Sequence, residues 1–117
     1  SDLYIKKGKA QNALNHAETA AQLQPTNPRL FWKLGQVLEL NQRFEDAEKA
    51  YLQALVQDPQ YAQAYFNLGN LLFEQKSYTR AKLAFQAFLE IWKEESEFRN
   101  FAQNRLNQCN QKLAQTQ

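Results

Sequence analysis

The chain has 117 residues, a single cysteine and a formal net charge of +2. This length fits one domain, the lone cysteine excludes an internal disulfide, and the weak charge gives no reason to expect nucleic acid or a membrane surface as the partner. The composition is rich in helix-forming residues and has no apolar run near the roughly 20 residues of a membrane span, so we expect an all-α protein without direct membrane insertion.

Prolines and turn-forming residues divide the chain into helices. Asn27 and Pro28 are typical of an N-cap followed by the first helical residue, and Pro59 is expected to end the helix before it. Turn-like segments at 41–43 and 75–77 separate further helices. The predicted helices span residues 2–7, 10–23, 28–41, 44–57, 62–75, 78–92 and 96–114.

A spacing of 34 residues relates these helices, because Leu34 and Gly35 recur as Leu68 and Gly69. The same spacing joins further similar residues: Phe31 and Tyr65, Leu38 and Leu72, Phe44 and Tyr78, Ala47 and Ala81, Tyr51 and Phe85, and, extended backwards, Ala13 and Ala47, Ala20 and Ala54, Pro25 and Pro59. A whole column of matches indicates an internal repeat. The break inside each period predicts two antiparallel helices per repeat.

These residues make the chain resemble the tetratricopeptide repeat (TPR) family. The family pattern is an aromatic residue, Leu-Gly, a large apolar residue, Ala, an aromatic residue, Ala and Pro within about 34 residues. One repeat has every place filled: Phe31, Leu34, Gly35, Leu38, Ala47, Tyr51, Ala54 and Pro59. In the next repeat Phe88 replaces the second Ala and Lys93 replaces the Pro. The resemblance implies a right-handed α-solenoid of helix-turn-helix units.

Two glycines, Gly35 and Gly69, fall inside predicted helices. Glycine costs about 1 kcal/mol there relative to alanine. We interpret them as points where the two helices of a hairpin cross too closely for a side chain. Ala47 and Ala81 are expected to face them from the second helix.

We expect one domain, 1–117, made of a partial repeat 1–27, repeats 28–61 and 62–95, and a capping helix 96–114. Too few residues precede Gly8 for a complete first helix, so we expect a fragment of a longer chain whose truncated N-terminal edge offers a surface for self-association. The apolar residues of the capping helix are expected to face the last repeat: Phe98, Phe101, Ala102, Leu106, Cys109 and Leu113.

No group of residues predicts catalysis. The only histidine, His16, is expected at the surface, and Cys109 is expected to act as a small apolar residue. One His and one Cys cannot form a zinc site, and the scattered glycines form no phosphate-binding loop. We therefore expect a non-enzymatic protein without catalytic residues, metal ion or cofactor.

The resemblance implies that a protein or peptide partner binds in a concave groove lined by the first helix of each repeat. The predicted partner-binding residues are Arg29, Trp32, Lys33, Gln36, Phe66, Asn67, Asn70 and Phe73, and the capping helix is expected to add Asn100 and Asn104. Rings and amides suit a peptide partner. Acidic residues on the same face, such as Glu39 and Glu74, disfavour nucleic acid.

TPR domains that hold acidic chaperone tails use Lys and Asn, then Asn, then Lys and Arg on successive first helices. The matching places here hold Trp32 and Gln36, then Asn67, then Glu97 and Phe101. Only Asn67 fits, so such a clamp is not expected. The alternative to an interaction scaffold is a structural or oligomerisation spacer within a larger, possibly enzymatic, protein.

Overall fold

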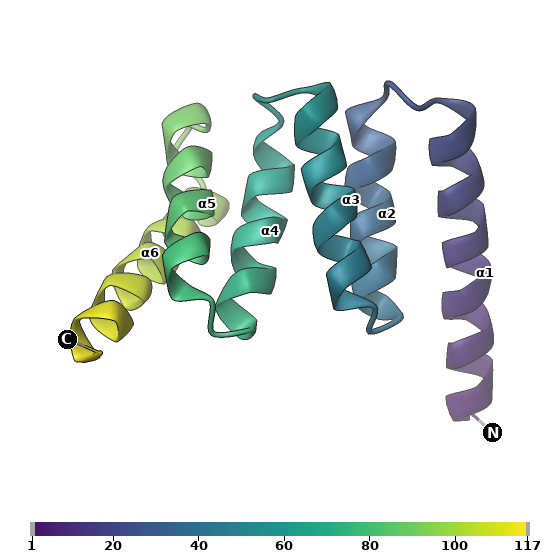
Figure 1. Ribbon diagram of the computed structural model, residues 1–117, viewed down its shortest axis with the longest axis horizontal. Coiled ribbons are helices and arrows are strands. Elements are labelled where there is room, and N and C mark those ends of the chain that lie inside the picture. Colours follow the sequence, from purple (N-terminus) through teal and green to yellow (C-terminus); the bar gives the residue numbers. More distant parts are fainter. Residues whose placement is uncertain (1, 117) are drawn as a thin grey trace. The chain divides into compact units, whose positions relative to one another are not determined.

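The computed structural model describes residues 2–116, and within them every regular element is an α-helix (Figure 1). The helices are α1 (Asp2–Leu23), α2 (Pro28–Leu40), α3 (Phe44–Gln57), α4 (Ala62–Glu74), α5 (Tyr78–Ile91) and α6 (Glu97–Gln115). They fall into two compact units, one with α1 to α3 and the other with α4 to α6. The predicted all-α helical repeat is confirmed. No helix of the described part is long and apolar enough to cross a membrane.

In the first unit, α2 and α3 form a hairpin and α1 packs against α2. The start of α2 is capped as predicted, since the Asn27 side chain accepts a hydrogen bond of 3.1 Å from the Arg29 N–H and Pro28 lies in the first turn. The start of α3 carries Glu45 and Asp46, whose negative charges suit the positive end of the helix dipole. Local sequence signals thus mark the start of each helix in this hairpin.

The first helix differs from the prediction, because α1 runs through Gly8 without a break. The expected separate helices at 2–7 and 10–23 are wrong. A helix of six residues is too short to be stable by itself, whereas a continuous helix keeps the backbone hydrogen bonds on both sides of Gly8. No other part of the described chain crowds this site, since a Cβ at Gly8 would meet no atom within 4 Å.

Each hairpin crosses where a glycine meets an aromatic ring. A Cβ added at Gly35 would come within 2.6 Å of Tyr51 Cδ1, and one at Gly69 within 2.9 Å of Phe85 Cε1. The predicted close crossing agrees with the structure, and the atoms nearest to each glycine belong to the Tyr51 and Phe85 rings, while Ala47 and Ala81 of the same helices are fully buried. A ring is flat enough to cover a glycine at a distance that leaves no room for a methyl group.

The second unit consists of the α4–α5 hairpin and α6, which packs mainly against α5 (Figure 1). Ala102 and Cys109 are fully buried, as the prediction of an apolar stripe required. Burial also raises the pKa of the Cys109 thiol, which favours its inert, protonated form. Phe98 and Phe101, also expected in that stripe, contact Phe66 of the last repeat but keep 56% and 40% of their surface exposed. Both lie at the edge of the stripe that faces α4.

The turns inside the two hairpins place Gln42 and Lys76 at φ values of 60° and 63°. Glycine adopts this conformation without steric cost, whereas other residues are strained there. We predict that Gln42→Gly and Lys76→Gly each raise the free energy of unfolding by about 0.5 kcal/mol in urea denaturation. The control is Gln86→Gly, at an exposed position within α5, which should lower stability by about 1 kcal/mol. Equal losses in all three variants would contradict the prediction.

Candidate functional site

The predicted partner-binding residues lie on one helix of each unit. Arg29, Trp32, Lys33 and Gln36 are on α2, in the first unit, and Phe66, Asn67, Asn70 and Phe73 are on α4, in the second. Within each helix the spacings of three, four and seven residues put the four side chains on one face.

On α2, the Trp32 ring packs against Tyr61, with ring centroids 6.0 Å apart and planes at 59°. Arg29 and Lys33 are exposed, and Gln36 is partly exposed. Burial raises the pKa of the Tyr61 phenol, and the nearby positive charge of Arg29 opposes that shift. Tyr61 therefore belongs to this face, although sequence reasoning missed it. The sequence feature that could have indicated Tyr61 is an aromatic residue directly after the turn at Pro59.

On α4, Phe66 is the centre of an aromatic cluster that ties the helices of the second unit together. Its ring lies 5.1 to 6.5 Å from four others: Phe85, Phe88, Phe98 and Phe101. Phe66 itself is half-buried. The accessible aromatic area of the cluster therefore comes from Phe98 and Phe101 rather than from Phe66.

Arg105 of α6 joins this cluster to Phe73. Its guanidinium carbon lies 4.2 Å from the centroid of the Phe73 ring and 5.1 Å from that of Phe101, within the range of cation–π contacts. Arg105 also pairs with Glu74 at 3.4 Å. Beside it, a surface hollow of about 330 Å³ is lined by Phe101, Asn104, Arg105 and Gln108. Asn104, which was predicted to add to the partner-binding face, thus lines this hollow.

Asn67 and Asn70 are both half-buried on the same face of α4. The Oδ1 atom of Asn70 is buried and has no hydrogen-bond donor in the described part of the chain. A buried acceptor without a donor costs free energy of about 1–3 kcal/mol. We call the residues Phe66, Asn70, Phe73, Phe98, Phe101 and Arg105 the α4–α6 surface.

Sequence reasoning missed Phe98, Phe101 and Arg105 as members of this surface. Their spacing of three and four residues places them on one face of α6. Phe98 and Phe101 were also counted in the apolar stripe of this helix, so the sequence did not distinguish the two faces. Only packing decides which of two neighbouring stripes is buried. Ala102 and Cys109 are small enough for the close contact with α5, which leaves the large rings at the edge.

Among residues 2–116, no three His, Cys, Asp or Glu side chains are placed to hold a metal ion. His16 is exposed on α1 in one unit, and Cys109 is buried in the other. What the two helical faces provide is flat rings, amides and cations.

The helical hairpins and these faces define a helical-repeat module that presents side chains to a partner. A tetratricopeptide repeat model matches residues 1–62 and 41–96, and the chain belongs to this family, which confirms the sequence-based assignment.

Among solved structures, the chain is similar to the Sgt2 TPR domain from Aspergillus fumigatus, with a TM-score of 0.81, 21% identity, and coverage of 98% of this chain and 75% of that one. It is also similar to the first TPR of Spaghetti (RPAP3) bound to an HSP90 peptide, with a TM-score of 0.80, 26% identity, and coverage of 97% and 86%.

Among curated proteins, the chain is 30% identical over 95 residues to the protein O-mannosyl-transferase TMTC1 of Mus musculus. The match covers 78% of this chain and 10% of the relative. The chain thus spans about a tenth of the length of this relative.

Proposed function

We propose that the chain is a non-enzymatic protein-interaction module that binds a peptide segment of a partner. The observation that carries the proposal is the α4–α6 surface, where the exposed Phe101 ring lies beside the Arg105 guanidinium and the exposed Phe98 ring packs on Phe66. The exposed parts of these two rings lie outside the buried core of the second unit. Exposed aromatic rings next to a cation are typical of residues that dominate binding energy at protein interfaces.

The chemistry of this surface suits an extended peptide. Rings lose little rotamer entropy on binding, so each offers a large contact area at low entropic cost. Rotation of the Asn70 side chain would bring its unsatisfied oxygen to a peptide N–H, and the new hydrogen bond would remove the cost of burial without a donor. Arg105 would favour a carbonyl or carboxylate oxygen of the ligand.

The predicted α2 residues offer a second proposed peptide-binding face, which belongs to the first unit and is considered by itself. Trp32 supplies a ring, Gln36 an amide, and Arg29 and Lys33 positive charge. The structural relative bound to an HSP90 peptide supports peptide binding as the general mode. The residues expected of an acidic-tail clamp are replaced here at Trp32, Gln36 and Phe101, so we propose a ligand that is anchored by aromatic contacts instead.

The test is selection of ligands for the folded chain from a displayed random peptide library, followed by calorimetry with the winning peptide. For a peptide that contacts the α4–α6 surface, Phe101→Ala should weaken binding about tenfold and Asn70→Ala severalfold; for one that contacts the α2 face, Trp32→Ala should weaken binding severalfold. Leu83→Ala, at an exposed position on α5, is the control and should bind like the parent. Circular dichroism must show that every variant folds. If all the folded variants bind equally well, the proposal fails and the spacer function takes its place.

A further inference from the structure

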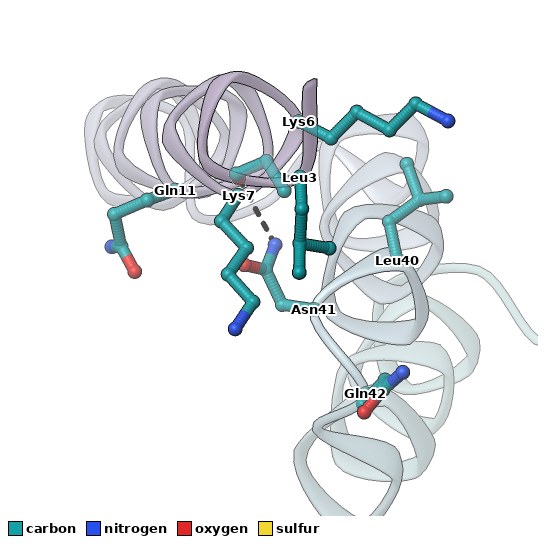
Figure 2. A pocket seen from close by; sticks show the side chains of 8 residues that line it. Leu3, Lys6, Lys7, Gln11, Leu40, Asn41 and Gln42 are labelled. Carbon is teal, nitrogen blue, oxygen red and sulfur yellow. Dashed lines mark hydrogen bonds between the residues drawn. The ribbon is translucent and has the colours of Figure 1, made fainter. Parts of the chain in front are cut away.

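A second hollow lies in the first unit, where the beginning of α1 meets the end of α2. It has a volume of about 420 Å³, which is within the range of pockets that hold small ligands or a few side chains. Its lining includes Leu3, Lys6 and Lys7 from α1, and Leu40 and Asn41 from the end of α2 (Figure 2). We call it the Leu3–Leu40 pocket. It lies at the opposite end of α2 from Arg29.

The apolar part of this pocket is formed by two leucines that the fold leaves uncovered. Leu3 is 60% exposed and Leu40 is 73% exposed. The 34-residue spacing makes Leu3 the equivalent of Val37 and Leu71, and Leu71 is only 3% exposed. The same position of the repeat is thus exposed at Leu3 and buried at Leu71.

The rim of the pocket is positively charged. Figure 2 shows the side chains of Lys6 and Lys7 extending to opposite sides of Leu3. Residues 3–17 contain Lys6, Lys7 and Lys9 but no Asp or Glu. The acids next to the pocket in sequence are Asp2 and Glu39, and Glu39 accepts a hydrogen bond from the Tyr51 hydroxyl, which holds it within the α2–α3 hairpin. Lys6 and Lys7 are both exposed, and their charges can pair with the carboxylates of a ligand.

The wall of the pocket is held in place by hydrogen bonds. The Asn41 side-chain amide donates to the Ala10 carbonyl at 3.0 Å (dashed line in Figure 2). It also donates to the Val37 carbonyl at 2.9 Å. The bond to Ala10 joins the end of α2 to α1, and the bond to Val37 holds the Asn41 side chain against the last turn of α2. The two leucines are consequently presented by a preformed frame, which lowers the entropic cost of binding.

We propose that the Leu3–Leu40 pocket binds a short acidic segment of a partner protein, with one large aliphatic side chain between flanking carboxylates. The aliphatic group lies against Leu3 and Leu40, and the carboxylates pair with Lys6 and Lys7. The charge of the rim is what selects an acidic segment over a neutral or basic one. This site is separate from the α4–α6 surface and does not rest on the function proposed above.

The test uses a fluorescein-labelled peptide, Ser-Glu-Glu-Leu-Glu-Glu-Ser, titrated with the whole chain at low salt. Fluorescence anisotropy should give a dissociation constant below about 1 mM. Leu40→Ala should weaken binding about fivefold, and the double variant Lys6→Glu with Lys7→Glu about tenfold or more. The charge reversal should leave folding intact, because acids are favoured near the start of a helix. A peptide with serine in place of leucine, and one with glutamine in place of glutamate, should each bind more weakly than the parent peptide.

Two matched variants in the other unit separate this site from the α4–α6 surface. Lys112→Glu and Phe101→Ala should both leave binding of the acidic peptide unchanged. Absence of binding by the parent chain, equal binding by the pocket variants, or loss of binding only in Phe101→Ala would each overturn the proposal. The last experiment is sedimentation of the chain alone. If the parent chain forms a dimer and the Leu40→Ala variant is a monomer, the pocket binds a second copy of this chain, and the acidic-segment proposal is overturned.

Discussion

Replacing Gly35 with alanine should lower the free energy of unfolding by about 2 kcal/mol, although alanine is the better helix former. The added Cβ would lie 2.6 Å from Cδ1 and 2.9 Å from Cζ of Tyr51, distances that require the ring or the helices to move. Overpacking of this kind costs about 1–3 kcal/mol, and the gain in helix propensity of about 1 kcal/mol only partly offsets it. Leucine at the same site should cost about 3 kcal/mol or more.

The other two glycines give a graded set of controls for this prediction. At Gly69 the nearest atoms of Phe85 lie 2.9 to 3.0 Å from the added Cβ, so Gly69→Ala should cost less than Gly35→Ala. At Gly8 a Cβ meets nothing within 4 Å, and Gly8→Ala should raise stability by about 1 kcal/mol. Urea denaturation of the three variants measures the order. A Gly35→Ala variant as stable as Gly8→Ala would contradict the close crossing.

The 34-residue repeat made most of the fold predictable, because the helix boundaries found in one repeat could be transferred to the next repeat. The helices of the two hairpins begin and end within about two residues of the prediction, where Pro28, Pro59 and the turns fix them. The glycines correctly indicated a close crossing. They could not reveal which residue of the second helix lies opposite, since Ala47 and Tyr51 are one turn apart and both fully buried.

The features that sequence reasoning missed depend on what each segment packs against. Gly8 has the spacing of Gln42 and Lys76, which both take positive φ in turns, yet α1 continues through it. In the hairpins the turn is stabilised by contacts between the helices on either side of it, and residues 2–7 make no such hairpin. The exposure of Phe98 and Phe101 was missed for a related reason, because the choice between adjacent stripes of α6 is made by the shape of α5.

The Tyr51 side chain should contribute the most to the stability of the first unit. It is fully buried, its ring covers Gly35, and its hydroxyl donates a hydrogen bond to the Glu39 carboxylate. Tyr51→Ala should lower the free energy of unfolding by about 3–5 kcal/mol, as is usual for removal of a buried aromatic ring. Tyr51→Phe keeps the ring, so it should cost only about 1–2 kcal/mol at pH 7, when Glu39 loses its donor.

The pH dependence of the Tyr51→Phe variant distinguishes the lost hydrogen bond from a packing effect. Burial raises the pKa of Glu39 above its ordinary value of 4.5, and the hydrogen bond from Tyr51 lowers that pKa in part. Because the folded state holds the Glu39 proton more tightly than the unfolded state, the contribution of Glu39 to stability falls as the pH rises from about 4.5. Removing the hydroxyl raises the pKa further and makes this fall steeper.

The cost of Tyr51→Phe should therefore be larger at pH 7, where a half-buried carboxylate is left without its donor, than at about pH 4, where Glu39 is protonated and uncharged. Urea denaturation of the parent and the variant at both pH values measures the difference. In a Glu39→Gln background, the same substitution should show little change in cost between the two pH values, because the titrating group is gone. A cost for Tyr51→Phe that is independent of pH in the parent background would show that the hydroxyl does not act on the charge of Glu39.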